Sequence, residues 1–266
     1  TAYTYAEYGN LITVVDPEGF TTMYTDDGGG NLLSTTDANG RTTTYAYDAN
    51  DRLIRVTDFT GRMVRFGYDA NGDLVTVTGP AVTGTPTGND FPNGKTTLYT
   101  YQTDNSEPLL SHNLTSIIEP LYNVNDDPAQ SKAWITFHYH GTHNPEHLRF
   151  DRVQSVRWGH DAGGSPSNPS VVVGGTTMLH YLDNLTGDAD APSGASVRCR
   201  EDDPNGNRTR YYFDSAQQLL RQVVETNRGI RPGEGDYTRD YSYTPDGLVA
   251  HLQLPRGNSI SYRYSG

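Results

Sequence analysis

The stretch YAYDANDRLIRVTDFTG, residues 45–61, contains two short alternating runs, and each run is followed by a turn. In the first run, Tyr45 and Tyr47 are two residues apart and so lie on the same side of the chain. In the second run, LIRVT, Ile54 and Val56 likewise lie two residues apart. Side chains that repeat every two residues are typical of β-strands. Asp48 and Asp58 begin the two turns, where an aspartate can accept backbone N–H groups and Asn or Gly can supply a positive φ. The stretch therefore predicts a β-hairpin whose strands are about five residues long.

The same pattern recurs every 21 residues through the first 80 residues. The recurring positions are the leucines Leu11, Leu32, Leu53 and Leu74; the tyrosines Tyr3, Tyr24 and Tyr45; the pairs Tyr47–Asp48 and Tyr68–Asp69; and the turn residues Asp16 and Gly19, Asp37 and Gly40, and Asp58 and Gly61. A fixed period of this length indicates one supersecondary unit copied in tandem, and such units bury their faces by stacking on their neighbours. We therefore interpret these residues as structural positions of the repeat, and we expect the three tyrosines to stack as neighbours across adjacent units.

Beyond residue 80 the repeats become longer and irregular. Gly, Pro, Thr and Asn are concentrated in insertions such as residues 81–95 and 161–169, which read as loops. Hairpins resume between these insertions, with Val153 to Trp158 predicted as one strand and Tyr181 predicted to pair with the region of Cys199. We predict a single array over residues 1–266, with strict units in 1–80, elongated units in 81–266 and roughly nine units in all.

The two faces of the predicted sheet differ in polarity. Ile54 and Val56 lie on an apolar side of their strand, whereas Arg55 lies on the other, mostly polar side. A sheet of this kind can leave one face exposed to water. Asn71–Gly72 in the fourth unit predicts a two-residue hairpin turn.

The composition excludes several classes of protein. Lysines and arginines number 20 against 32 aspartates and glutamates, a net charge of −12, which argues against nucleic acid or an anionic membrane as the main partner. No apolar run approaches the length of about 18 residues that a membrane helix needs. No signal peptide opens the chain. Because Thr1 already lies within a repeat, we expect a longer parent array, with targeting signals lying outside this segment.

The pairs Tyr47–Asp48, Tyr68–Asp69 and Phe213–Asp214, with the turns at residues 16–19 and 203–206, resemble the YD repeats of Rhs proteins. Asp26 departs from the pattern, because it stands where tyrosine is usual. The resemblance implies an all-β fold in which tandem YD-repeat β-hairpins form a spiralling antiparallel sheet, part of a hollow shell. It relates the chain to bacterial Rhs toxins, toxin-complex C subunits and teneurins.

The resemblance also implies a function. We expect a bacterial, secreted or cell-surface structural protein: a shell segment that encapsulates a C-terminal toxin or other cargo, with no catalytic residue and no cofactor. Its partners would be the remaining YD repeats of the parent chain and the enclosed cargo. The alternative is a cell-surface adhesion or carbohydrate-binding array, with glycans or proteins bound at the loops 81–95 and 161–169. Since sheet building explains the regular residues, we expect binding to lie in the insertions or the flanks.

A metal site is the remaining candidate. His138 and His140 share one side of a predicted strand, so both imidazoles could reach one metal ion, with His143 or His147 as a third ligand. A polar face without metal is the simpler interpretation. The acidic pairs at residues 26–27 and 126–127 offer oxygen ligands for calcium but lack the spacing of a calcium-binding loop.

Overall fold

The computed structural model describes residues 1–86, 88, 90–103, 108–120, 133–141, 151–159, 161–162, 171–172, 174–227 and 230–264. The chain divides into two compact units, Thr1–Tyr101 with Ser116–Ala133, and Gln102–Thr115 with Trp134–Gly266. In these described residues, nineteen strands belong to one hydrogen-bonded sheet, and two short strands form a separate pair. In the described part of the chain the only helical segment is the 3-10 helix η1, Pro108–Leu110. The predicted all-β fold is thus confirmed.

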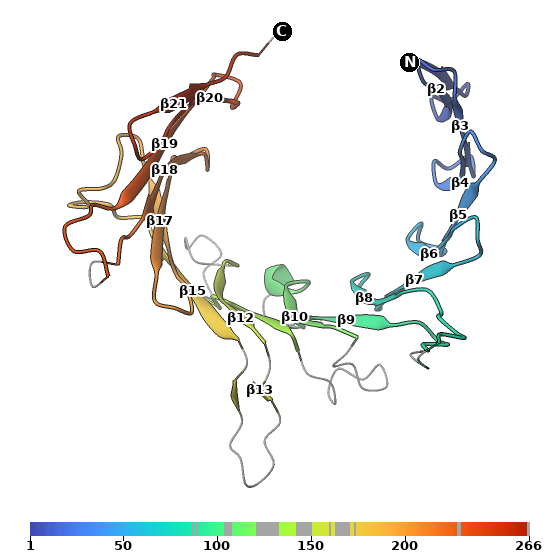
Figure 1. Cartoon of the computed structure of the whole chain (residues 1–266), viewed down its shortest axis with the longest axis horizontal. Coiled ribbons are helices and arrows are strands. Elements are labelled where there is room, and N and C mark those ends of the chain that lie inside the picture. Colours follow the sequence, from blue (N-terminus) through green and yellow to red (C-terminus); the bar gives the residue numbers. More distant parts are fainter. Residues whose placement is uncertain are drawn as a thin grey trace. The chain divides into compact units, whose positions relative to one another are not determined.

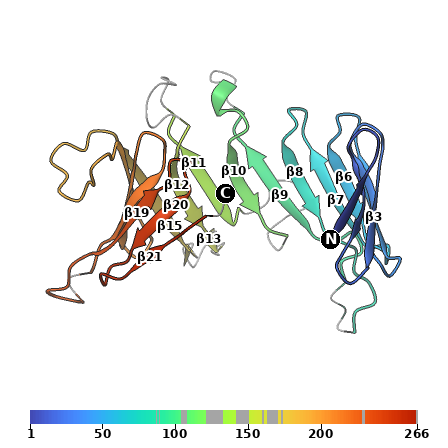
Figure 2. The same cartoon turned by 90° about the horizontal axis from the view of Figure 1, so that it is seen from above.

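The first unit is built from strands that follow one another in space as they do in the sequence (Figure 1). Its strands are β1 (Ala2–Tyr5), β2 (Leu11–Val15), β3 (Thr21–Asp26), β4 (Leu32–Thr36), β5 (Thr42–Tyr47), β6 (Leu53–Thr57), β7 (Met63–Tyr68), β8 (Leu74–Thr78) and β9 (Thr96–Tyr101). Each strand from β1 to β8 pairs antiparallel with the next. Figure 2 shows β6, β7 and β8 side by side. Strand β10 (Leu114–Ile118) has residues in both units.

The second unit repeats this arrangement with longer connections. Its strands are β11 (Ile135–Tyr139), β12 (Val153–Trp158), β13 (Asp161–Ala162), β14 (Val171–Val172), β15 (Gly175–Leu182), β16 (Val197–Asp202), β17 (Arg208–Phe213), β18 (Leu219–Val224), β19 (Tyr237–Tyr243), β20 (Val249–Gln253) and β21 (Ser259–Ser261). The predicted strand from Val153 to Trp158 is confirmed, and Tyr181 pairs with Cys199 as expected. Among the described residues, strands β13 and β14 pair with each other alone.

The turns that end each hairpin are held by their first aspartate. The Asp37 carboxylate accepts the N–H groups of Asn39 at 2.9 Å and Arg41 at 2.8 Å. The fourth turn residue takes a positive φ, which glycine adopts without strain, and Gly40 has a φ of 75°. One aspartate therefore organises a five-residue connection.

The predicted two-residue turn at Asn71–Gly72 is wrong. Tyr68 pairs with Leu74, so five residues separate the two strands. The Asp69 carboxylate accepts the N–H groups of Asn71 and Asp73, both at 2.9 Å, and these bonds hold the longer turn.

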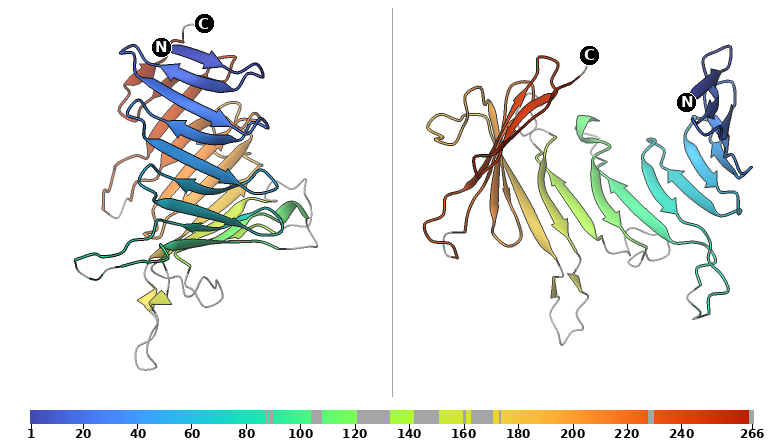
Figure 3. Two further views of the ribbon diagram at one scale, coloured as in Figure 1. Left: turned by 90° about the vertical axis from the view of Figure 1, so that its right-hand side faces the viewer. Right: turned by 45° about the horizontal axis from the view of Figure 1, so that its top comes forward.

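Buried side chains are few in both units. Strands β1 to β8 contain none that is fully buried, because each face of this part of the sheet stays partly exposed. Figure 3 shows these strands in blue and cyan, lying side by side. In the second unit Tyr212 and Val223 are 0% and 1% exposed. Other parts of the chain therefore cover these side chains. One of them is the connection between β15 and β16, whose Asp188 binds the Tyr212 hydroxyl.

Candidate functional site

The second tyrosine of several repeats fastens one hairpin to the hairpin before it. The Tyr68 hydroxyl donates to the Leu53 carbonyl oxygen at 3.0 Å. The same bond recurs from Tyr101 to Leu74, from Tyr139 to Leu114, from Tyr243 to Leu219 and from Tyr264 to Val249, at 2.9–3.0 Å. Because Leu53 begins the second strand of its hairpin, the bond crosses from one repeat to the next. Asp26 holds the tyrosine position in β3, where its carboxylate accepts the Gly28 N–H instead.

The first tyrosines of the repeats are placed differently from the expectation. Tyr3 pairs with Val14, Tyr24 with Thr35 and Tyr45 with Val56. A whole strand thus separates successive tyrosines, and neighbouring strands lie about 4.8 Å apart. The tyrosines are not direct cross-strand neighbours, and aliphatic and threonine side chains lie between them.

The insertion between β15 and β16 is fastened to the sheet by a carboxylate. Asp188 accepts a hydrogen bond from Arg198 Nη1 at 2.7 Å and from the Tyr212 hydroxyl at 3.2 Å. The Asp188 side chain is only 10% exposed. Although burial opposes it, bonds from the Asp190 N–H, Arg198 and Tyr212 hold the pKa of Asp188 below its usual value. We call residues 183–196 the strap, because they lie over β16 and β17.

A second set of ion pairs extends the fastening to β18. Arg210 contacts the Asp190 carboxylate and lies 3.1 Å from Glu225 and 3.3 Å from Asp236. Arg221 Nη1 donates to the Asp190 carbonyl oxygen at 2.9 Å. Arg210 and Arg221 are thus paired with the protein's own carboxylates and a carbonyl group. We therefore assign this cluster to structure.

Sequence reasoning missed the cluster. Its signal was an arginine on each of three consecutive strands, beside an insertion that carries Asp188 and Asp190. That signal becomes specific only when the register of the three strands is known.

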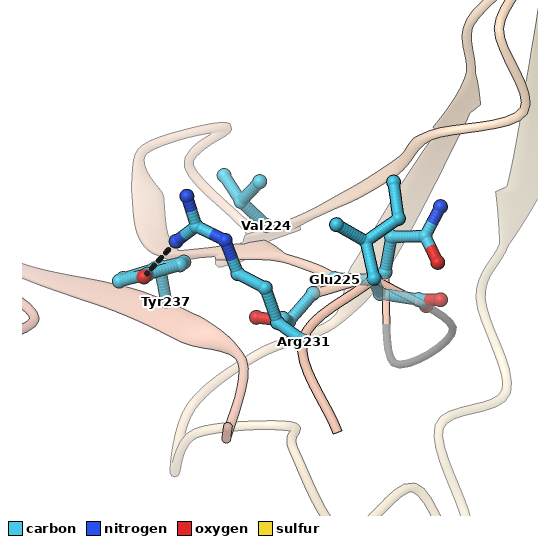
Figure 4. Close-up of a pocket in the computed structure, with 7 residues that line it drawn as sticks. Val224, Glu225, Arg231 and Tyr237 are labelled. Atoms are coloured by element: carbon cyan, nitrogen blue, oxygen red, sulfur yellow. Dashed lines mark hydrogen bonds between the residues drawn. The ribbon is translucent and has the colours of Figure 1, made fainter. Parts of the chain in front are cut away.

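A hollow of about 400 Å³ lies beside the connection between β18 and β19 (Figure 4). Val224 and Tyr237 pair across the two strands and line it, together with Ile230 and Arg231. Arg231 Nη1 donates to the Tyr237 hydroxyl at 3.1 Å, and this hydroxyl donates to Glu234 at 3.1 Å. The hollow suits an apolar side chain, and the polar ends of Arg231 and Tyr237 that line it are engaged with each other.

The predicted metal ligands lie at the end of β11. His138 is exposed, and its Nδ1 lies 3.5 Å from Ser155 Oγ. The ring of His140 stands edge-on to Tyr181, with 6.1 Å between the centroids. His143 and His147 lie outside the described residues. Within the part of the chain that is described, no three His, Cys, Asp or Glu side chains are grouped to hold a metal, so this site stays a prediction.

The candidate calcium residues at positions 26–27 are used by a turn. The carboxylates of Asp26 and Asp27 accept the N–H groups of Gly28 and Gly29, each at 2.8 Å. Residues 126–127 lie outside the described part of the chain.

The loops assigned to carbohydrate binding are described in part. In residues 81–95, Val82 and Phe91 form an isolated bridge, and the Asp90 carboxylate accepts the Gly84 N–H at 2.9 Å. In residues 161–169, only Asp161–Ala162 are described, and they belong to β13. The carbohydrate-binding alternative stays a prediction. Among the described residues, no helix is long and apolar enough to span a membrane.

Comparison with known proteins gives one family match. The model of the RHS Repeat family matches residues 27–63 and 47–81. These segments contain the turns at Asp37, Asp48 and Asp58 and the tyrosine bond from Tyr68 to Leu53. No curated protein matches the chain.

Solved structures give weaker likenesses. The crystal structure of TcdB2–TccC3–Cdc42 shares 14% identity at a TM-score of 0.33, over 99% of this chain and 16% of that one. The Photorhabdus luminescens Tc holotoxin pore shares 13% identity at 0.22, over 99% of this chain and 17% of that one. A porin-like protein from Bacteroides uniformis shares 12% identity at 0.26, over 98% of this chain and 86% of that one.

Scores this low carry no argument about function, and the chain spans about one sixth of the length of the first of these structures. The family match rests instead on the sequence of residues 27–81, where the turn aspartates and glycines recur in register and where Tyr68 bonds to the Leu53 carbonyl. Residues 27–81 of the chain thus match the RHS Repeat family and carry the features of its repeats.

Proposed function

We propose that the chain is a structural segment of an Rhs shell that encloses a toxin or other polypeptide cargo. On this proposal residues 1–266 form one array, whose partners are further YD repeats of the parent chain and the cargo. The protein would be a secreted or cell-surface component of a bacterium. Its work would be mechanical and protective, without chemistry of its own.

The tyrosine–leucine bond between hairpins is the observation that carries the proposal. The Tyr68 hydroxyl reaches the Leu53 carbonyl of the preceding repeat, and Tyr243 reaches Leu219 in the second unit in the same way. A tyrosine that recurs at the same position of several repeats thus joins each of them to the repeat before it. This use is what a wall of indefinite length requires, because every repeat contacts only its neighbours.

Sheet chemistry supports a protective role. Along an array of paired strands, the backbone N–H and C=O groups of inner strands are taken up by their neighbours, which leaves few edges to recruit other chains. A continuous wall of this kind screens its contents from proteases. The turns between β4 and β8 are short and held by aspartate carboxylates, so they offer proteases no extended loop to cleave.

Electron cryo-microscopy of the full-length protein tests the proposal. We expect a wall one sheet thick that surrounds separate density for the cargo, and cargo that resists protease until the wall is opened. A solid β-sandwich without an internal space would refute the proposal, as would a cargo digested at the same rate with and without the wall.

A further inference from the structure

Two arginines stand out among the strands of the first unit. Strands β1 to β9 contain three charged residues, Asp26, Arg55 and Arg65. Asp26 ends β3, where its carboxylate accepts the Gly28 N–H at 2.8 Å. Arg55 and Arg65 lie in the middle of β6 and β7. They are the only cationic side chains in strands β1 to β9.

The two arginines lie directly opposite each other. Arg55 pairs with Arg65 in the antiparallel register of β6 and β7. Residues in such a pair share a face of the sheet, with about 5 Å between their Cβ atoms. Like charges in this position repel each other and weaken the pairing. The fold itself gains nothing from this arrangement.

Neither arginine is neutralised by the protein. Both side chains are exposed, and among the described residues neither makes a hydrogen bond or an ion pair. Other arginines do find partners: Arg52 lies 2.7 Å from Asp48, and Arg198 lies 2.7 Å from Asp188. The pair at the centre of the strands is thus a local excess of positive charge on a chain whose net charge is −12.

The side chains around the pair are small or carry hydroxyl groups. Arg55 is flanked across the strands by Ala46, and Arg65 by Thr78. Thr57 lies two residues from Arg55 and so shares its face. Small and hydroxyl-bearing side chains leave both guanidinium groups accessible and add further hydrogen-bonding groups.

We propose that Arg55 and Arg65 form a docking site for an extended acidic segment of another protein. Each guanidinium can bind a carboxylate through two parallel hydrogen bonds. Carboxylates two residues apart on an extended chain lie on one side and about 7 Å apart, within reach of both arginines. The overall charge of −12 repels a long polyanion such as nucleic acid. A short acidic segment interacts mainly with the positive charges of the two arginines, because more distant charges are screened by salt.

This inference goes beyond the shell proposal, because the site binds an acidic segment whether or not that segment is enclosed. The probe is the peptide Glu-Ser-Glu-Ser-Glu-Ser carrying an uncharged dye, with Gln-Ser-Gln-Ser-Gln-Ser as its neutral counterpart. Fluorescence anisotropy at low salt measures binding to the full chain. We expect the acidic peptide to bind, the neutral peptide not to bind, and the affinity to fall as salt is raised.

The test variant is Arg55→Gln with Arg65→Gln, and the control is Arg256→Gln with Arg263→Gln, which makes the same change in charge at two other exposed arginines. We expect the affinity to fall about tenfold or more in the test variant and less than about twofold in the control. The thermal midpoint of the test variant should equal or exceed that of the wild type, because the repulsion is removed. Should this variant fail to fold, Arg55→Lys with Arg65→Lys keeps the charge and should weaken binding several-fold by removing the bidentate geometry.

Three outcomes would overturn the proposal. The first is no binding of the acidic peptide by the wild type. The second is an equal loss of affinity in the test and control variants. The third is a single-stranded DNA oligomer that binds through the same arginines more tightly than the peptide, which would make the site one for polyanions.

Discussion

Replacing Asp188 with Asn should release the strap from the sheet. The Asp188 carboxylate accepts hydrogen bonds from Arg198 at 2.7 Å, from the Tyr212 hydroxyl at 3.2 Å, and from the Asp190 N–H at 3.2 Å. Asparagine keeps the shape and one oxygen acceptor. It removes the negative charge, however, and puts an NH₂ donor in the place of one of the two oxygens that accept from Arg198, Tyr212 and the Asp190 N–H.

The expected cost follows from burial and bond type. The Asp188 and Arg198 side chains are 10% and 23% exposed, so water compensates only partly for the lost carboxylate. A hydrogen bond to a charged group contributes about 1.5–3 kcal/mol when it is removed by mutation. We expect the free energy of opening the strap to fall by about 2–3 kcal/mol, which corresponds to an increase of about 30- to 150-fold in the opening equilibrium.

Amide hydrogen exchange followed by mass spectrometry measures this opening directly. Peptides from the strap should exchange faster in Asp188→Asn by that factor, whereas peptides from β4 to β6 should not change. Asp183→Asn is the matched control, because Asp183 lies in the same connection and is exposed. Equal exchange in the two variants would refute the assignment of the strap to Asp188.

The same contact predicts a dependence on pH. The folded pKa of Asp188 is lowered from the usual value of 3.8; burial opposes the shift, and the Asp190 N–H, Arg198 and Tyr212 produce it. A lowered pKa means that the stabilisation is complete above the ordinary value and is lost as the pH falls through the folded pKa. After correction for intrinsic exchange rates, protection of the strap should be constant from pH 7 to about 5 and should fall below pH 3.8 in the wild type. This fall should be smaller in Asp188→Asn.

Three further changes test the sheet itself. Tyr68→Phe removes the bond to the Leu53 carbonyl and should lower the free energy of unfolding by about 1 kcal/mol in urea titrations, and an unchanged midpoint would contradict the joining role. Gln217 has a φ of 63° at a turn position where other repeats carry glycine, so Gln217→Gly should remove backbone strain and raise the thermal midpoint by an amount equivalent to about 0.5–1 kcal/mol. A lower thermal midpoint would show that the positive φ of Gln217 does not destabilise the fold. Burial raises the pKa of the Cys199 thiol to about 11, although a hydrogen bond with Tyr181 opposes this, so a thiol reagent at pH 8 should label the folded protein far more slowly than the urea-unfolded protein; equal rates would contradict burial.

The regular part of the fold could be predicted from the sequence because the residues that form each turn and strand lie within the repeat itself. The aspartate that starts a turn, the glycine three residues later and the alternating strand are all local, so the hairpins at residues 3–78 appear where the period places them. The strand Val153–Trp158 was predictable for the same reason. The length of the turn at Asn71–Gly72 was not, because the Asp69 carboxylate overrides the preference of that dipeptide for a two-residue loop.

The strap could not be predicted, because its partners meet only through register. Arg198 pairs with Tyr212, and Tyr212 pairs with Arg221, so these residues form one row across three strands. A slip of one residue in either pairing would send part of the row to the opposite face. The loop lengths between the strands set that register, and they follow no fixed period in this part of the chain.

The expectation that binding lies in the insertions or the flanks stays a prediction, and the contacts of one insertion are structural. We expected the insertions to carry function and the regular strands to carry structure. The strap is an insertion, yet its carboxylates bind Arg198, Tyr212 and Arg210 of the sheet. The strict repeats have no such cover, and their strands place Arg55 and Arg65 together without a partner. Since turn bonds and tyrosine bonds already hold those repeats, an unfavourable pair of charges there is the feature that structure alone does not explain. The regular face of the array is therefore the better place to look for a partner.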